Sequence, residues 1–80
     1  ILLVLLRFEN KNGVMKLNRI KAVLAEKDFS QKELAKRLGK SFNTVNAYCC
    51  NRQQPSLELL KKISTILSVS IKDLIIDDNE

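Results

Sequence analysis

The side chains that could do chemistry gather in the middle of the chain, between Ser41 and Gln53. Most of them carry hydroxyl or amide groups, and Arg52 adds a guanidinium group. An Asn amide can pair with the edge of adenine through two hydrogen bonds, and an apolar side chain can contact the methyl group of thymine. Basic and amide side chains concentrated around one short segment are therefore suited to reading DNA bases.

The residue inventory argues against an enzyme. The chain contains no His, so the commonest general base is absent. Its two glycines, Gly13 and Gly39, are too few to build a loop that cradles phosphate. Cys49 and Cys50 are adjacent and lack zinc-ligand spacing, which favours two small apolar residues in a reducing cytosol. We expect neither catalytic activity nor a metal or other cofactor.

Two short helices joined by a sharp turn are expected to position the polar segment. Ser30 and Glu33 form an S-x-x-E capping box at the start of a helix over residues 31–38. Gly39 suits the left-handed backbone conformation that often ends a helix. Ser41 can cap a second helix over residues 42–50. Ala35 leaves room where the two helices cross steeply, because a larger side chain there would overpack.

The sequence SQKELAKRLGKSFNTVNAY, followed by NRQQPSLELLKKI, resembles the helix-turn-helix of the Cro/C1 (Xre) family of bacterial and phage repressors. The similarity extends over about residues 17–75. It implies an all-α, five-helix, lambda-repressor-like DNA-binding domain whose third helix enters the major groove. Further helices are expected over residues 17–27, 57–67 and 71–75, with no strand in this region.

Apolar spacing predicts which residues of the outer helices are buried. In the first helix these residues are Ile20, Val23 and Leu24. The fourth helix follows a Ser56 cap, and its predicted buried stripe consists of Leu57, Leu60, Ile63 (or Ser64) and Leu67. Ser70 and Asp73 form another capping pair, at the start of the fifth helix.

The resemblance also implies, position by position, which residues contact DNA. Those that usually face bases are Phe42, Asn43 and Ala47. Those that reach bases or adjoining phosphates are Ser41, Thr44 and Asn46. Those that contact phosphates are Gln31, at the start of the preceding helix, and the loop residues Asn51, Arg52 and Gln53. The alternatives left open are that Ser41 only caps its helix, that Phe42 packs into the core and that Arg52 is a solvated charge.

Three positions depart from the usual family pattern. Cys49 stands where Glu is frequent, so an ion pair or backbone bond made by that acid is expected to be absent. Asn51 stands where Gly is frequent, and Asn is the next best residue for a left-handed conformation, so the turn should form. Phe42 is large for a base-reading position, which favours contact with a thymine methyl or stacking.

Charge is unevenly distributed along the chain. The formal net charge is +5, but residues 15–64 contain eleven Lys or Arg and four Asp or Glu, a net of +7. The segment from Asp73 onward contains four acidic residues and no basic one. A basic body suits a polyanion such as DNA, although an ordinary solvated basic surface has the same composition.

The domain is expected to span residues 15–76, with an N-terminal extension over residues 1–14 and an acidic tail over residues 77–80. The extension opens with ILLVLL, far shorter than the roughly 20 apolar residues of a membrane span, and lacks signal-peptide features. We therefore expect a cytoplasmic protein without membrane contact. The apolar run would suit a strand paired with a second copy. A helix packed on an apolar patch, or a segment foreign to the ancestral domain, are the alternatives.

The C-terminal segment is more apolar than a short end element needs, so part of it is expected to face a second subunit. Its apolar residues are Val69, Ile71, Leu74, Ile75 and Ile76.

The leading hypothesis is a sequence-specific transcriptional regulator, expected to be a repressor, that binds an inverted repeat in double-stranded DNA as a homodimer. Two alternatives use the same fold: an antitoxin-like module that binds a toxin-like protein, and a protein-interaction domain that never meets DNA.

Overall fold

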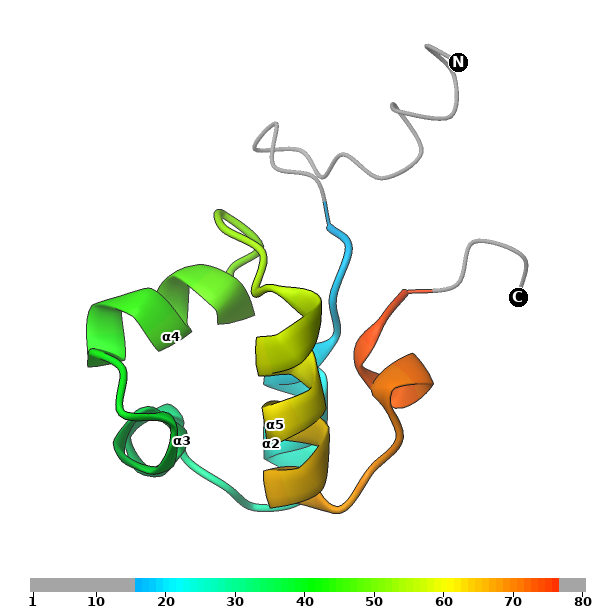
Figure 1. Cartoon of the computed structure of the whole chain (residues 1–80), viewed down its shortest axis with the longest axis horizontal. Helices are drawn as coiled ribbons and strands as arrows, with labels where there is room; N and C mark the ends of the chain where they lie inside the picture. Colours follow the sequence, from blue (N-terminus) through cyan, green and yellow to red (C-terminus); the bar gives the residue numbers. More distant parts are fainter. Residues whose placement is uncertain (1–15, 77–80) are drawn as a thin grey trace, which may run out of the picture.

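The computed structural model describes residues 16–76, so the predictions for the extension over residues 1–14 and for the tail over residues 77–80 lie outside the described part. In chain order the elements are α2 (Ile20–Glu26), α3 (Gln31–Leu38), α4 (Phe42–Cys49), α5 (Leu57–Leu67) and a short 3₁₀ helix, η1 (Ile71–Leu74). Figure 1 shows α5 in front of α2, with α3 and α4 on one side of this pair and η1 on the other. The predicted all-α class is confirmed.

The first helix is shorter than predicted. It begins at Ile20 rather than at residue 17, because the backbone before it is extended and pairs with the C-terminal segment. Asn18 and Ile75 form an isolated antiparallel β-bridge, and Ile76 N donates a hydrogen bond to Leu17 O at 2.9 Å. We call this contact between the two ends of the domain the terminal bridge. No β-strand occurs within residues 16–76, as predicted.

The fifth element was predicted as an α-helix over residues 71–75 and is instead the 3₁₀ helix η1, so the five-helix prediction is corrected to four α-helices among the described residues. The predicted capping pair is present: Ser70 N and Ser70 Oγ donate to the Asp73 carboxylate at 3.1 and 2.9 Å. These hydrogen bonds from Ser70 lower the pKa of Asp73.

The Leu74 side chain is fully buried in the core of its own domain, so it cannot face a second subunit.

Serine hydroxyls begin three of the helices as predicted. Ser30, Ser41 and Ser56 each accept a hydrogen bond from the backbone N–H three residues further on, at 3.0 or 3.1 Å. Each such cap contributes about 1 kcal/mol to stability. The Glu33 carboxylate, expected to complete a capping box, accepts a hydrogen bond from Arg37 Nε at 3.0 Å.

One apolar core joins all five elements. Its most deeply buried side chains are Ile20, Val23, Leu34, Val45, Ile63 and Leu74. The predicted buried face of α2 is confirmed, but the buried stripe predicted for α5 is partly wrong. Leu57 is 70% exposed, and Leu59 is buried instead. Leu57 lies six residues before Ile63, which places it about 120° around the helix from that core residue, whereas Leu59 lies one turn before it.

The packing of α3 against both α4 and α5 fixes the helix-turn-helix on the core. Ala35, predicted at the steep crossing, is 4% exposed, so the small side chain is enclosed there. Among the described residues, no helix is both long enough and apolar enough to cross a membrane.

Candidate nucleic-acid interface

A left-handed turn at Gly39 joins α3 to α4. The Gly39 backbone has φ of 67°, as the sequence predicts. Lys40 N donates to Ala35 O at 3.0 Å and Gly39 N donates to Lys36 O at 3.3 Å, which satisfies carbonyl groups at the end of α3. A Cβ atom placed on Gly39 would meet no atom within 4 Å, so the backbone conformation, and not lack of space, favours glycine here.

One face of α4 is buried and the other is open to solvent. Val45, Tyr48 and Cys49 are buried and attach the helix to the core. Phe42 is 51% exposed and Asn43 is exposed, so both residues lie at the open start of the helix. The structure therefore does not support the alternative that Phe42 packs into the core. Figure 1 shows α4 at the edge of the molecule, with its outer side uncovered by any other helix.

The remaining predicted residues of α4 lie around this open start. Ser41 is exposed, and its Oγ lies 2.9 Å from Thr44 Oγ1 while it also caps the helix. The hydroxyls of Ser41 and Thr44 are therefore already paired with each other in the free protein. Asn46 and Ala47 are half-buried. Asn46 Oδ1 accepts a weak hydrogen bond from the Cys50 thiol at 3.8 Å. Asn46 belongs to the same helix as Asn43.

Gln31 occupies the first position of α3, where backbone N–H groups without helical partners favour an anion. The residue is half-buried. Its Oε1 atom is buried and has no hydrogen-bond partner among the described residues. This location suits the phosphate contact that the family resemblance implies.

The loop after α4 divides into an exposed part and a buried part. Arg52 and Gln53 are exposed, and their backbone N–H groups both donate to Ala47 O, at 3.0 and 3.3 Å. Asn51 has φ of 60°, so the predicted left-handed turn is present. Its side chain, however, is only 8% exposed and is bonded within the protein. The Asn51 side chain therefore holds the loop from inside, and the predicted phosphate contact at this position is not supported by its side chain.

Asn18 is a residue of this region that the sequence did not single out. It is 3% exposed, and its Nδ2 atom donates to Tyr48 O at 2.9 Å and to Gln54 Oε1 at 2.8 Å. Asn18 lies 30 and 36 residues away from these partners in the chain, so no local pattern could indicate the contact. Its polarity at a position expected to be in a helix was the only available signal.

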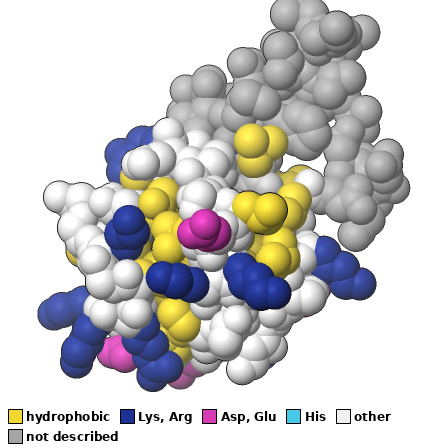
Figure 2. Space-filling view, in the orientation of Figure 1, with side chains coloured by type: hydrophobic (Ala, Val, Ile, Leu, Met, Phe, Trp, Pro, Cys, Tyr) yellow, Lys and Arg dark blue, Asp and Glu magenta, His cyan; other side chains and the backbone are white. Residues whose placement is uncertain are grey.

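Positive charge surrounds the helix-turn-helix. Exposed cations of α3 and its turn are Lys32, Lys36, Arg37 and Lys40. The guanidinium carbon of Arg37 lies 5.1 Å from the centre of the Phe29 ring and its Nε pairs with Glu33, so Arg37 is partly engaged within the protein. Figure 2 shows dark-blue Lys and Arg side chains spread over one face of the molecule, with few acidic side chains among them. Such a surface attracts a polyanion.

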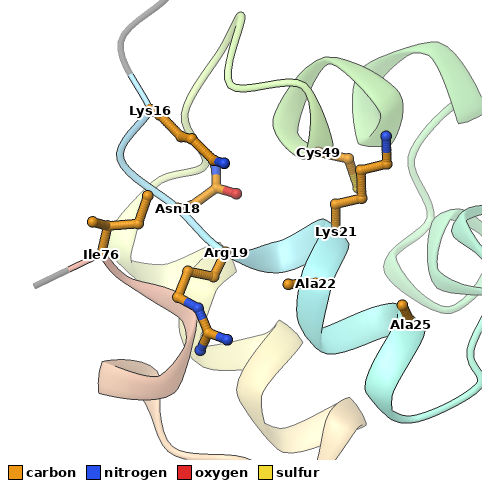
Figure 3. A pocket seen from close by; sticks show the side chains of 8 residues that line it. All are labelled: Lys16, Asn18, Arg19, Lys21, Ala22, Ala25, Cys49 and Ile76. Atoms are coloured by element: carbon orange, nitrogen blue, oxygen red, sulfur yellow. The ribbon is translucent and has the colours of Figure 1, made fainter. Parts of the chain in front are cut away.

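A shallow groove of about 530 Å³ lies beside the outer face of α2. Figure 3 shows Ala22 and Ala25 of α2 below it, Ile76 on one side and Cys49 on the other. None of the ten predicted DNA-contacting residues lines this groove. Burial, reinforced by the neighbouring Cys50, raises the pKa of the Cys49 thiol to about 11, so this thiol remains protonated at neutral pH.

The arrangement of α3, the Gly39 turn and α4, with one face of α4 open, defines a helix-turn-helix protein. The sequence profile of a family described as helix-turn-helix matches residues 20–74. The chain belongs to this family, in its Cro/C1-type form.

Individual relatives agree with this assignment. A helix-turn-helix-type transcriptional regulator from Archaeoglobus fulgidus, itself uncharacterised, is 37% identical over 62 residues, covering 78% of this chain and 87% of the regulator. The cryptic phage CTXphi transcriptional repressor RstR from Vibrio cholerae is 33% identical over 60 residues, covering 75% of this chain and 54% of the repressor. A crystal structure of a proposed DNA-binding protein from Bacteroides fragilis has 48% sequence identity and a TM-score of 0.74, covering 75% of this chain and 97% of that one.

Proposed function

We propose that this protein is a sequence-specific DNA-binding transcriptional regulator that inserts α4 into the major groove. The observation that carries the proposal is the open first turn of α4, where Phe42 and Asn43 are exposed beside a steep helix crossing. An exposed helix start of this kind can approach base edges without steric obstruction from the rest of the domain.

Base reading is assigned to the exposed start of α4. Asn43 can pair bidentately with adenine, and the half-exposed Phe42 ring can contact a thymine methyl. Ala47, half-buried one turn later on the same helix, can contribute an apolar contact. Ser41, Thr44 and Asn46 supply polar groups around these readers, toward bases or the adjoining phosphates.

Phosphate contacts are assigned to groups on either side of α4. Gln31 at the start of α3 supports one contact, and the exposed loop residues Arg52 and Gln53 support the other. The Asn51 side chain is excluded from this set because it is buried. Phosphate contacts fix the register of the protein on the duplex but carry no sequence information themselves.

We further propose that the protein acts as a repressor and binds an inverted repeat as a homodimer. Leu57 is 70% exposed and Ile75 is 41% exposed, and such large exposed apolar side chains favour a protein contact. A two-fold dimer would place two α4 helices one DNA turn apart, about 34 Å. The same apolar residues would serve an antitoxin-like complex, which is the second candidate.

Selection of bound sites from random double-stranded DNA tests the function directly. We expect an inverted repeat whose half-sites are centred about 10 base pairs apart. A single half-site would contradict the dimer, and failure to enrich any sequence would contradict sequence-specific binding.

Two variants separate base readers from phosphate contacts on the selected site. Asn43→Ala should cost about 1–3 kcal/mol and relax preference at one position of each half-site. Arg52→Ala should weaken binding to all sequences alike and reduce the slope of log affinity against log salt by about one unit. Titrations on cognate and scrambled DNA at several salt concentrations measure both effects. Identical, sequence-independent effects of the two variants would contradict the assignment.

A further inference from the structure

Three side-chain amides meet behind the DNA-facing loop. Asn51 Oδ1 accepts hydrogen bonds from Leu17 N at 2.9 Å, from Asn18 N at 2.9 Å and from Gln54 Nε2 at 3.1 Å. Asn51 Nδ2 donates to Asn18 O at 3.2 Å, and Asn18 Nδ2 donates to Gln54 Oε1 at 2.8 Å. We call Asn18, Asn51 and Gln54 the carboxamide cluster.

The buried amide atoms of the cluster all have hydrogen-bond partners within the protein. Both N–H groups of Asn18 Nδ2 have acceptors, Gln54 Oε1 and Tyr48 O, and its Oδ1 accepts a hydrogen bond from Ile20 N at 3.0 Å. Asn18 and Asn51 are 3% and 8% exposed. A buried polar network whose members are all paired favours one arrangement, since any displacement leaves a buried group without a partner.

The cluster connects α4 and its loop to the terminal bridge, and among the described residues no other hydrogen bonds join these two parts. The backbone bonds of Arg52 and Gln53 to Ala47 O attach the loop to α4 alone. The Asn18 bond to Tyr48 O and the Asn51 bonds to Leu17 and Asn18 then attach the end of α4 and its loop to the terminal bridge. The position of the loop relative to the rest of the domain therefore depends on these amides.

The left-handed turn itself does not require an Asn side chain. Glycine adopts φ near 60° at least as readily as Asn does, so Asn51→Gly would keep the backbone conformation. What such a change removes is the carboxamide and its four hydrogen bonds. The side chain at this position is therefore free to serve a purpose other than making the turn.

We propose that Asn18 and Asn51 are positioning residues for DNA binding, which hold Arg52 and Gln53 where they contact phosphate. This inference rests on the proposed function and adds to it a specific requirement for buried amides. Neither Asn18 nor Asn51 touches DNA in this arrangement; each acts through the loop.

A double-mutant comparison tests the proposal with the full chain and the selected DNA site. In the wild-type protein, Arg52→Ala should reduce the salt slope by about one unit. In the Asn51→Gly background the slope should already be reduced by about that amount, and adding Arg52→Ala should change it little further. Ser68→Gly is the matched control, because Ser68 also has a left-handed backbone (φ of 57°) but lies at the end of α5. It should leave the slope unchanged.

The outcomes distinguish failure of the positioning role from failure of the proposed function. If Arg52→Ala has its full effect in both backgrounds, Asn51 only stabilises the fold and the positioning role is wrong. If the wild-type protein shows no salt-dependent binding to any DNA, the proposed function itself fails. Circular dichroism checks folding, and if Asn51→Gly is unfolded, Asn18→Ala replaces it, because it removes the bond to Tyr48 O but keeps the bonds of Asn51 to the backbone of Leu17 and Asn18. Persistence of the full Arg52→Ala effect in Asn18→Ala would equally overturn the proposal.

Discussion

The two left-handed turns at the ends of α4 have nearly the same backbone conformation and opposite surroundings. Gly39 has φ of 67° and Asn51 has φ of 60°. The Gly39 turn is exposed and has open space where a side chain would begin. The Asn51 turn is buried, and its side chain makes four hydrogen bonds to residues distant in the chain or three positions away.

The difference shows that the same turn can be specified locally or through tertiary contacts. At Gly39 the absence of a Cβ atom is sufficient, because glycine alone adopts a left-handed conformation without steric cost. At Asn51 the steric cost is small but present, and the hydrogen bonds of the side chain offset it. Changes at the first turn should therefore act through the backbone, and changes at the second should act through residues far away in sequence.

The largest effect is expected from Asn18→Ala, which removes the side-chain hydrogen bonds to Tyr48 O and Gln54 Oε1, on either side of the Asn51 turn. The free energy of unfolding should fall by about 2–4 kcal/mol, because each buried group left unpaired costs about 1–3 kcal/mol. In this variant Ile20 N loses its acceptor, Gln54 Oε1 loses a donor, and Tyr48 O keeps only the hydrogen bond from Asn51 N. Urea denaturation followed by circular dichroism measures the change. A loss similar to that of an exposed-surface substitution would contradict the view that the second turn is held by tertiary contacts.

A smaller effect is expected at the first turn. Gly39→Ala should lower the free energy of unfolding by about 1–2 kcal/mol, the cost of a left-handed conformation for a residue with a Cβ atom. Since nothing lies within 4 Å of that atom, no packing cost should be added. Gly39→Asn is the matched control and should lose less than Gly39→Ala. Equal losses in the two variants would indicate that something other than backbone conformation acts at this position.

The smallest effects concern Cys49, which ends α4 just before the second turn. Cys49 is 4% exposed, whereas Cys50 is exposed. At pH 8, iodoacetamide should label one thiol of the native protein, Cys50, and both thiols after denaturation, as counted by mass spectrometry. Asn18→Ala should accelerate labelling of Cys49 by loosening the second turn, and Gly39→Ala should not. Equal acceleration by both variants would remove the distinction between the turns.

The same thiol predicts how stability depends on alkaline pH. Burial raises the pKa of Cys49 from 9.0 to about 11, so folding favours the protonated form. The corresponding stabilisation is complete below pH 9 and is lost as pH rises from about 9 to about 11. A Cys49→Ser variant should therefore show a shallower alkaline loss of stability than the wild-type protein in this window.

Much of the molecule follows from the sequence, because its signals are local. The Ser30, Ser41 and Ser56 caps and the buried face of α2 each depend on residues three or four positions apart. The left-handed conformation of Gly39 depends on that residue alone. Those signals were sufficient to place the helix-turn-helix and the exposed start of α4.

Only the tertiary structure decided the remainder. Leu57 and Leu59 both fit an apolar pattern, and the direction of the core selected Leu59. The start of α2 and the short η1 depend on the terminal bridge, which joins residues more than fifty positions apart. The hydrogen bonds of the Asn51 side chain could not be predicted from the sequence for the same reason, since an amide can equally contact phosphate or a buried backbone group. Its backbone partners lie thirty-three and thirty-four residues away, beyond the reach of any periodic pattern.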